Sequence, residues 1–417
     1  MKIPQADPLA HISRPAGRRL AFRVTPAGQR ALRGGHPWLF AEAVTHQGAG
    51  GEPGDLAVIF DDRRDFLAIG LYDPTSQIRV RVLQHGTPAA INVAWLGDRL
   101  QSALALRSAL PDTGTTGYRM VHGENDGLAG LVIDRYDATL VVKLYSLAWV
   151  RWLPDLRGAL QAICPAERVV LRLSRDLCRH PEYLYGLADG ATLSGPPPVG
   201  PVLFSENGLT FEADVLRGQK TGFFLDQRDN RARAATLADG RRTLNVFAYS
   251  GAFSVYAARG GAPEVLSVDS SEPALEAVGR NFAHNSHIPT VAASHHVEMA
   301  ADAFATMASL RDRGQRFGLV IVDPPSFAKR QSEADRALHS YARLTTLALG
   351  VLEAGGTLVI ASCSSRVEAP AFYATVTRAA EQSGRPLHQI GQTDHPLDHP
   401  VRFPEGAYLK CLFATAP

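Results

Sequence analysis

The sequence has few cysteines and no long apolar run. Its 417 residues include only four Cys and no C-x-x-C pair. So low a cysteine content excludes a disulfide framework of the kind found in secreted proteins. It favours a reducing compartment, and we therefore expect a cytoplasmic protein. No run of about 18 apolar residues is present to cross a membrane. The first twenty residues also lack the apolar core of a secretory signal.

Spacings typical of a metal site are missing as well. Histidines recur over 284–296 and again over 395–399, yet no cysteine or carboxylate stands at a matching spacing. Pro396 and Pro400 would interrupt any helical face of ligands. We therefore expect no bound metal.

Lysine is scarce, although positive charge is not. Five Lys stand beside 38 Arg, and the 43 basic residues nearly balance 41 acidic ones. A formal net charge of +2 neither demands nor excludes a nucleic-acid partner. The arginine excess would suit binding of phosphate groups, but biased codon usage explains it more simply.

The order of apolar patterns predicts several modules. Short β-type runs separated by turn signals come first, then a helical pattern and a hairpin-like alternation, and then a proline-rich linker near 193–201. The predicted modules are a flexible leader (1–19), a small β-rich domain (20–90), a central mixed α+β domain (91–195) and an α/β domain (196–417).

The last module has the pattern of a doubly wound parallel sheet. Apolar strand candidates such as TLNVFAYS, FGLVIVDPPS and GTLVIASCSS are separated by segments long enough for helices. This pattern predicts a Rossmann-like, nucleotide-binding type of domain.

The first strand of that module runs into a turn with one glycine, Gly251. The turn lacks the dinucleotide fingerprint G-x-G-x-x-G, but Asp269 follows 18 residues later at the end of the next strand. An acid there can accept hydrogen bonds from both hydroxyls of a ribose. An ordinary βαβ unit with a surface aspartate is the alternative.

Two further strand ends carry candidate catalytic residues. Within the run VIVDPPSF, Asp323 stands at the C-terminal end of a predicted strand, and Pro324 and Pro325 then stiffen a turn suited to holding a planar base. Cys363 follows the run LVIAS. A cysteine thiolate that adds to C6 of a pyrimidine makes C5 nucleophilic toward a sulfonium methyl group. A strand-ending acid in a turn and a cysteine that merely fills the core are the alternatives.

The run KTGFFLDQRDNR (220–231) precedes this sheet and mixes aromatic with polar side chains. Such a run beside a ligand crevice could supply stacking and hydrogen bonds. The start of a solvated amphipathic helix would give nearly the same pattern.

From about residue 20 onward, the chain resembles the bacterial large-subunit ribosomal RNA cytosine-C5 methyltransferases that carry an N-terminal PUA domain. The motifs that carry this resemblance are HPWLF (36–40), SQIRVRV (76–82), ENDGLAGLVIDRY (124–136), KTGFFLDQRDNR, NVFAYSGAFS, VDPPSF, SCSS and DHPVRFPEGAYLK (398–410). The resemblance implies a PUA RNA-binding domain, a central domain and a Rossmann-like class I methyltransferase domain that uses S-adenosylmethionine. It also implies 23S ribosomal RNA as partner, and it favours a homodimer.

The resemblance further implies roles for individual residues. The cofactor site would comprise Lys220, Thr221, Gly222, Phe224, Asp226, Gln227, Arg228, Phe247, Tyr249, Ser250, Gly251, Asp269 and Asp302. Cys363 matches the family's nucleophile and Asp323 its base-facing acid. The turn after Asp323 reads Pro-Pro-Ser instead of the Pro-Cys of the two-cysteine RNA cytosine methyltransferases, so one cysteine must suffice.

RNA contacts in the β-rich domain are assigned to Arg33, Arg79 and Arg81, with solvated strand faces as an equal alternative. The resulting hypothesis is methylation of cytosine C5 in 23S ribosomal RNA through a covalent cysteine adduct. A guanine N-methyltransferase, which needs no covalent catalyst, and a non-catalytic RNA-binding protein of ribosome assembly remain the alternatives.

Overall fold

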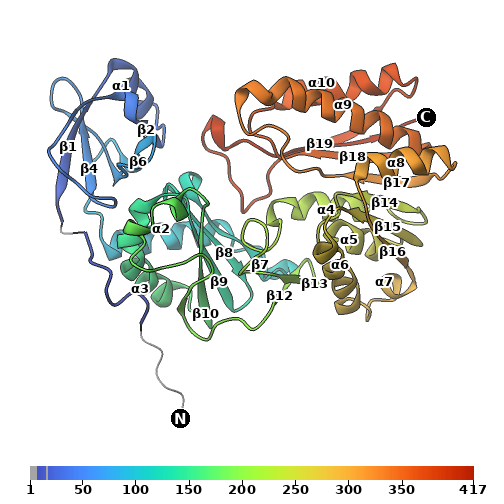
Figure 1. Cartoon of the computed structure of the whole chain (residues 1–417), viewed down its shortest axis with the longest axis horizontal. Coiled ribbons are helices and arrows are strands. Elements are labelled where there is room, and N and C mark those ends of the chain that lie inside the picture. The colour runs from blue at the N-terminus through green and yellow to red at the C-terminus, as the bar shows by residue number, and fades with distance from the viewer. Residues whose placement is uncertain (1–6, 16) are drawn as a thin grey trace, which may run out of the picture. The chain divides into compact units, whose positions relative to one another are not determined.

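The computed structural model describes residues 7–15 and 17–417, which divide into two compact units (Figure 1). The first unit contains the chain up to Ser205 together with Ala213–Phe223 and Leu397–Phe403. The second contains Glu206–Glu212, Phe224–Pro396 and Pro404–Pro417. No helix among the described residues has the length and apolar character needed to cross a membrane.

The first sheet of the first unit has six strands in the order β2-β6-β5-β4-β1-β3. Its elements are β1 (Arg19–Val24), α1 (Pro26–Arg33), β2 (Trp38–Phe40), β3 (Val44–Gln47), β4 (Leu56–Phe60), β5 (Phe66–Tyr72) and β6 (Ile78–His85). Alternation along β1 buries Leu20, Phe22 and Val24 against one core. Thr25 starts α1 by accepting a hydrogen bond from the Gly28 amide. The small β-rich module is therefore present.

A second sheet of five strands, in the order β11-β10-β9-β8-β7, forms the centre of the same unit. Its elements are α2 (Val93–Leu106), β7 (Gly117–His122), β8 (Leu131–Tyr136), β9 (Thr139–Leu144), α3 (Leu153–Ile163), β10 (Arg168–Leu173) and β11 (Thr192–Ser194). The Asn92 side chain caps α2 by accepting from the Trp95 amide at 2.9 Å. Both helices bury an apolar face against this sheet in one continuous core.

The leader differs from the expectation of a flexible segment over residues 7–15. Leu9 and Ile12 are buried in the core of the first unit, and the Arg151 guanidinium donates to the carbonyl oxygens of Ser13 and Arg14. Two apolar side chains three residues apart in a proline-containing segment carry too little periodicity to be recognised in the sequence. Residues 1–6 and 16 of the predicted leader lie outside the described residues.

The second unit is built on a sheet of seven strands in the order β16-β15-β14-β17-β18-β20-β19. Its strands are β14 (Thr243–Val246), β15 (Glu264–Asp269), β16 (His295–Ala300), β17 (Phe317–Val322), β18 (Leu352–Ser362), β19 (His388–Thr393) and β20 (Lys410–Thr415). Its helices are α4 (Arg228–Ala235), α5 (Ala252–Arg259), α6 (Glu272–His284), α7 (Pro289–Ala293), α8 (Ala303–Asp312), α9 (Ala334–Val351) and α10 (Ala369–Gln382). A two-stranded ribbon, β12 (Val202–Glu206) and β13 (Leu209–Ala213), precedes it.

The strands β14 to β18 run parallel, and β20 is antiparallel to both β18 and β19. Helices separate the parallel strands, as a doubly wound sheet requires (Figure 1). The predicted Rossmann-like α/β class is confirmed. The antiparallel pair β19–β20 was not predicted.

Short 3₁₀ helices join many of these elements. They are η1 (Ala41–Ala43), η2 (Pro111–Thr113), η3 (Gly123–Asp126), η4 (Leu147–Trp152), η5 (Leu177–Arg179), η6 (Pro181–Tyr183), η7 (Leu225–Gln227), η8 (Gln331–Glu333) and η9 (Pro404–Gly406). Two of them, η3 and η7, carry polar side chains that hydrogen-bond to residues of other elements.

Candidate active site

Four neighbouring parallel strands end at the same edge of the second sheet. β14 runs into the glycine turn, β15 ends at Asp269, β17 is followed by Asp323, and β18 is followed by Cys363. Ligands of open α/β sheets bind at this carboxyl edge. The candidate residues of three separate sequence motifs therefore lie along one edge of the same sheet.

The glycine turn between β14 and α5 is tightly constrained. Phe247, Tyr249 and Gly251 all adopt positive φ values (60°, 49° and 72°), which are uncommon for residues other than glycine. A Cβ atom on Gly251 would lie 2.3 Å from the Cγ1 atom of Val278, so only glycine fits there. Ser250 is buried, and its hydroxyl oxygen has no hydrogen-bond partner among the described residues. A buried hydroxyl of this kind beside the sheet edge fits a site for a polar ligand.

Asp269 holds this turn in place. Its Oδ2 atom accepts from the Tyr249 amide at 2.8 Å, and its Oδ1 atom accepts from the Ser271 amide at 2.9 Å. Each carboxylate oxygen can accept a further hydrogen bond, so Asp269 can also receive ribose hydroxyls. The two backbone contacts fix the direction in which the carboxylate presents those acceptors.

A hollow of about 490 Å³ lies next to Asp269, between the start of α6 and the start of α8. Asp302 is exposed at this hollow and caps α8, because its Oδ1 atom accepts from the Ala305 amide at 2.8 Å. Its Oδ2 atom has no donor within the part of the chain that the structure describes. The volume and the two acids suit an adenosine group, which is consistent with the expected positions of Asp269 and Asp302.

Asp323 is half-buried and belongs to a chain of side-chain hydrogen bonds. Its Oδ1 atom accepts from Gln227 Nε2 at 2.8 Å, Gln227 Oε1 accepts from Asn230 Nδ2 at 2.5 Å, and Asn230 Oδ1 accepts from the Thr393 hydroxyl. Gln227 and Asn230 are almost fully buried. Gln227 was predicted to bind the cofactor, and that role stays a prediction; its hydrogen bond to Asp323 points to a second role, the orientation of that carboxylate.

Cys363 lies against the Asp-Pro-Pro turn. Its thiol donates to the carbonyl oxygen of Pro324, and the Sγ to oxygen distance is 3.8 Å. Pro324 is buried, Pro325 is exposed, and the cysteine is half-buried. The two motifs that carry the candidate nucleophile and the candidate base-binding acid are therefore in contact.

Lys410 is a functional candidate to which the sequence analysis assigned no role. It pairs with Ser362 across the β18–β20 ladder, is almost fully buried, and donates to the carbonyl oxygens of Ser364, Val367 and Tyr408. Burial lowers the pKa of Lys410 to about 8, while the charge of the nearby Cys363 thiolate acts to raise it. One of only five lysines in an arginine-rich chain was a signal that could have drawn attention to it.

Other residues of the run 220–231 contact the glycine turn, Tyr408 just before β20, or a neighbour within the run. The rings of Phe224 and Tyr249 are edge to face, with centroids 5.0 Å apart. Asp226 Oδ2 accepts from the Tyr408 hydroxyl at 2.7 Å, and Arg228 Nε donates to Asp229 Oδ1 at 3.1 Å. These contacts give Asp226 and Arg228 partners within the second unit.

Lys220, Thr221 and Gly222 belong to the first unit. Thr221 is fully buried and its hydroxyl donates to Asp134 Oδ2 at 2.5 Å, while the Lys220 carbonyl accepts from Lys143 Nζ at 2.7 Å. Gly222 has a φ of 127°, and a Cβ atom there would lie 2.9 Å from the Asp214 carbonyl oxygen. Their assignment to the cofactor stays a prediction.

The three arginines expected to contact RNA differ in their surroundings. Arg33 is exposed and pairs with Asp61 at 2.7 Å, and Arg79 is half-buried. Arg81 is buried and binds Glu124 at 2.9 Å and the Tyr145 carbonyl at 3.2 Å. Arg81 thus points to a carboxylate of η3 and is less accessible than Arg33, and its assignment to RNA stays a prediction.

Known protein families and relatives match both the N-terminal domain and the methyltransferase-type sheet of this chain. A family model described as S-adenosylmethionine-dependent methyltransferase matches residues 119–414, and a PUA-like domain model matches residues 22–85. The chain is 46% identical over 400 residues to a ribosomal RNA large subunit methyltransferase of Deinococcus radiodurans, covering 95% of this chain and 97% of that one. It is 38% identical over 388 residues to ribosomal RNA large subunit methyltransferase I of Photobacterium profundum, covering 92% and 96%.

A solved structure shares the fold. The crystal structure of a methyltransferase complexed with SAH superposes with a TM-score of 0.80 at 21% sequence identity, covering 95% of this chain and 99% of that one. The edge residues described above, with the hollow beside Asp269 and the unpartnered hydroxyl of Ser250, fit a nucleoside-containing cofactor. The chain therefore belongs to the family of S-adenosylmethionine-dependent methyltransferases, with an N-terminal PUA-like domain and S-adenosylmethionine as its cofactor.

Proposed function

We propose that this protein methylates C5 of a cytosine in 23S ribosomal RNA, with Cys363 as the nucleophile. The observation that carries the proposal is the 3.8 Å contact between the Cys363 thiol and the Pro324 carbonyl oxygen. This contact places a cysteine beside a turn of the kind suited to holding a planar base. The names of the two relatives given above, ribosomal RNA large subunit methyltransferases, support the choice of substrate.

Each residue has a chemical task in this reaction. The target cytosine leaves its stack and lies against the Asp-Pro-Pro turn, where Asp323 binds the exocyclic amine or holds a proton at the ring nitrogen. The Cys363 thiolate forms a bond to C6, and the displaced π electrons make C5 nucleophilic. S-adenosylmethionine supplies the methyl group that C5 attacks. Loss of the C5 proton to water or to a polar group then lets the electrons re-form the C5–C6 double bond and expel the thiolate.

The surrounding residues keep this geometry rigid. Gln227 donates to one oxygen of Asp323 and so fixes the orientation of this carboxylate at the Asp-Pro-Pro turn. The Lys410 ammonium holds the carbonyl oxygens that follow Cys363 and supplies a positive charge close to the thiolate. The PUA-like domain would add affinity for RNA through shape and phosphate contacts.

The test is nucleoside analysis by mass spectrometry of 23S ribosomal RNA from cells with and without this gene, followed by bisulfite mapping. Loss of one 5-methylcytosine, restored by the wild-type chain and not by Cys363→Ala, is the expected result. Retained methylation by Cys363→Ala would favour N-methylation of guanine, whose nitrogens need no covalent catalyst. Failure of the wild-type chain to bind S-adenosylmethionine in calorimetry would favour a non-catalytic role.

A further inference from the structure

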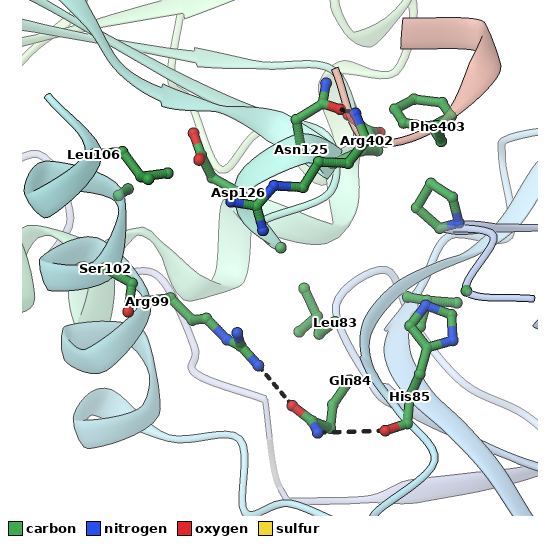
Figure 2. Close-up of a pocket in the computed structure, with 16 residues that line it drawn as sticks. Leu83, Gln84, His85, Arg99, Ser102, Leu106, Asn125, Asp126, Arg402 and Phe403 are labelled. Carbon is green, nitrogen blue, oxygen red and sulfur yellow. Dashed lines mark hydrogen bonds between the residues drawn. The ribbon is translucent and has the colours of Figure 1, made fainter. Parts of the chain in front are cut away.

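A cavity of about 520 Å³ lies in the first unit, and its walls include none of the residues assigned above to methyl transfer (Figure 2). It is bounded by the end of β6, by α2, by η3 and by Arg402 and Phe403 from the segment Leu397–Phe403. Its volume is in the range of sites that hold a small ligand or a single monomer of a polymer.

Two guanidinium groups give this cavity its charge. Arg99, on α2, lies over the Trp95 ring at 5.0 Å and donates to Gln84 Oε1 at 2.6 Å. Arg402 is exposed, its backbone amide is held by Asn125 Oδ1 at 2.7 Å, and its side chain extends across the cavity (Figure 2). Neither guanidinium lies within ion-pair distance of a carboxylate of the described residues. Both can therefore bind an anion from outside.

The acidic residues in the wall do not cancel that charge. Asp126 is held by both terminal nitrogens of the buried Arg107, at 2.9 and 2.7 Å. Glu124 is held by the buried Arg81 at 2.9 Å. Each carboxylate in the wall is thus paired with a buried arginine outside the cavity lining. The charges of Arg99 and Arg402 are therefore not neutralised by these carboxylates.

The cavity also offers a flat surface and a polar edge. The Phe403 ring packs edge to face on Trp38, with centroids 5.2 Å apart, so its position is fixed, and Leu106 on α2 is 40% exposed. His85 Nδ1 contacts the Leu32 carbonyl at 3.1 Å, and burial lowers the pKa of His85, so its ring is neutral near pH 7. With Nδ1 donating to that carbonyl, Nε2 is left as an acceptor.

We propose that this cavity binds one unpaired nucleotide of the RNA substrate, separate from the nucleotide that is methylated. Arg99 and Arg402 bind its phosphate, the base packs on Phe403 and Leu106, and His85 accepts from an amino group on the base edge. Only a nucleotide out of its helix can enter, because paired and stacked bases have no exposed face. The inference rests on the proposed function only in taking RNA as the substrate.

The test uses the full chain and a fluorescent, single-stranded RNA oligonucleotide of mixed sequence that contains 4-thiouridine. The double variant Arg99→Ala, Arg402→Ala should bind this RNA about tenfold or more weakly, because it loses charge-assisted contacts to phosphate. Its slope of log affinity against log salt should become shallower by about 0.7, since single strands give about 0.7 for each phosphate neutralised and the two arginines share one phosphate.

The matched control is the double variant Arg63→Ala, Arg64→Ala. It removes the same charge from an exposed turn between β4 and β5 that does not line the cavity, and it should leave the affinity and the slope unchanged. S-adenosylmethionine binding in calorimetry and the melting curve should match the wild type in both variants, which separates this test from loss of folding and from the proposed methyl-transfer chemistry.

Photocrosslinks from 4-thiouridine should map to peptides that contain 82–85 or 402–403. Equal losses of affinity in the two double variants, or crosslinks found only elsewhere on the chain, would overturn the proposal. Displacement of the RNA by free nucleoside monophosphates at comparable concentrations would also overturn it and would assign the cavity to a free nucleotide.

Discussion

Lys410 pairs with Ser362 across the β18–β20 ladder and so stands next to Cys363. Its ammonium is buried, and three backbone carbonyl oxygens accept its hydrogen bonds. A buried positive charge beside a cysteine favours the thiolate over the thiol. Lys410 is thus placed to stabilise both the attacking thiolate and the loop that carries it.

Removal of this charge should slow methyl transfer. We expect Lys410→Met to lower kcat about tenfold or more, because the thiolate loses a neighbouring cation in a low-dielectric site. Binding of S-adenosylmethionine should not change, which calorimetry would check. A kcat equal to that of the wild type would mean that Lys410 only supports the fold.

The same residue predicts a pH dependence. The pKa of Lys410 is lowered to about 8, so the ammonium loses its proton in the folded protein as the pH rises through that value. We expect kcat of the wild type to fall in this window. Lys410→Arg, whose guanidinium stays charged, should lack this fall. Between about pH 8 and the ordinary lysine value the unfolded chain binds more protons than the folded one, so this group makes stability rise with pH there.

Cys363 should form a covalent bond with its substrate. An RNA whose target cytosine carries fluorine at C5 cannot lose a proton there, so the adduct should persist and migrate as a protein–RNA complex on a denaturing gel. Cys363→Ala should give no such complex. Cys411→Ala, which changes a fully buried cysteine of β20, is the control that should still form it.

Two roles of Gln227, orientation of Asp323 and binding of the cofactor, predict different kinetics. If it orients Asp323, as the 2.8 Å hydrogen bond indicates, Gln227→Ala should lower kcat about tenfold and leave the KM for S-adenosylmethionine unchanged. If it binds the cofactor, as predicted from the sequence, the KM should rise. Steady-state kinetics with varied S-adenosylmethionine separates the two results.

The glycine turn should tolerate no side chain at Gly251. We expect Gly251→Ala to destabilise the protein by about 2 kcal/mol or more, from the positive φ and from the contact with Val278. Adding Val278→Ala should recover part of the loss, because it removes the two methyl groups nearest the new Cβ atom. Melting temperatures of the single and double variants check this, and a double variant no more stable than Gly251→Ala would contradict the steric explanation.

Local patterns were enough to predict the parallel strands and the ends at which Asp269, Asp323 and Cys363 lie. Each of those residues follows an apolar run, and a parallel sheet brings such ends to one edge. Lys410 received no role because its position depends on the antiparallel pairing of β20 with β18, which joins residues far apart in the chain. The burial of Arg81 could not be predicted for a related reason, because its partner Glu124 lies in a connection between two strands of another sheet.

The segment Leu397–Phe403 belongs to the first unit although the strands on either side of it belong to the second. The chain passes from one unit to the other after Ser205, Glu212, Phe223, Pro396 and Phe403. No single cut can therefore release either unit whole. Recombination at one breakpoint would likewise exchange neither of them intact, in keeping with relatives that match over more than nine-tenths of the length.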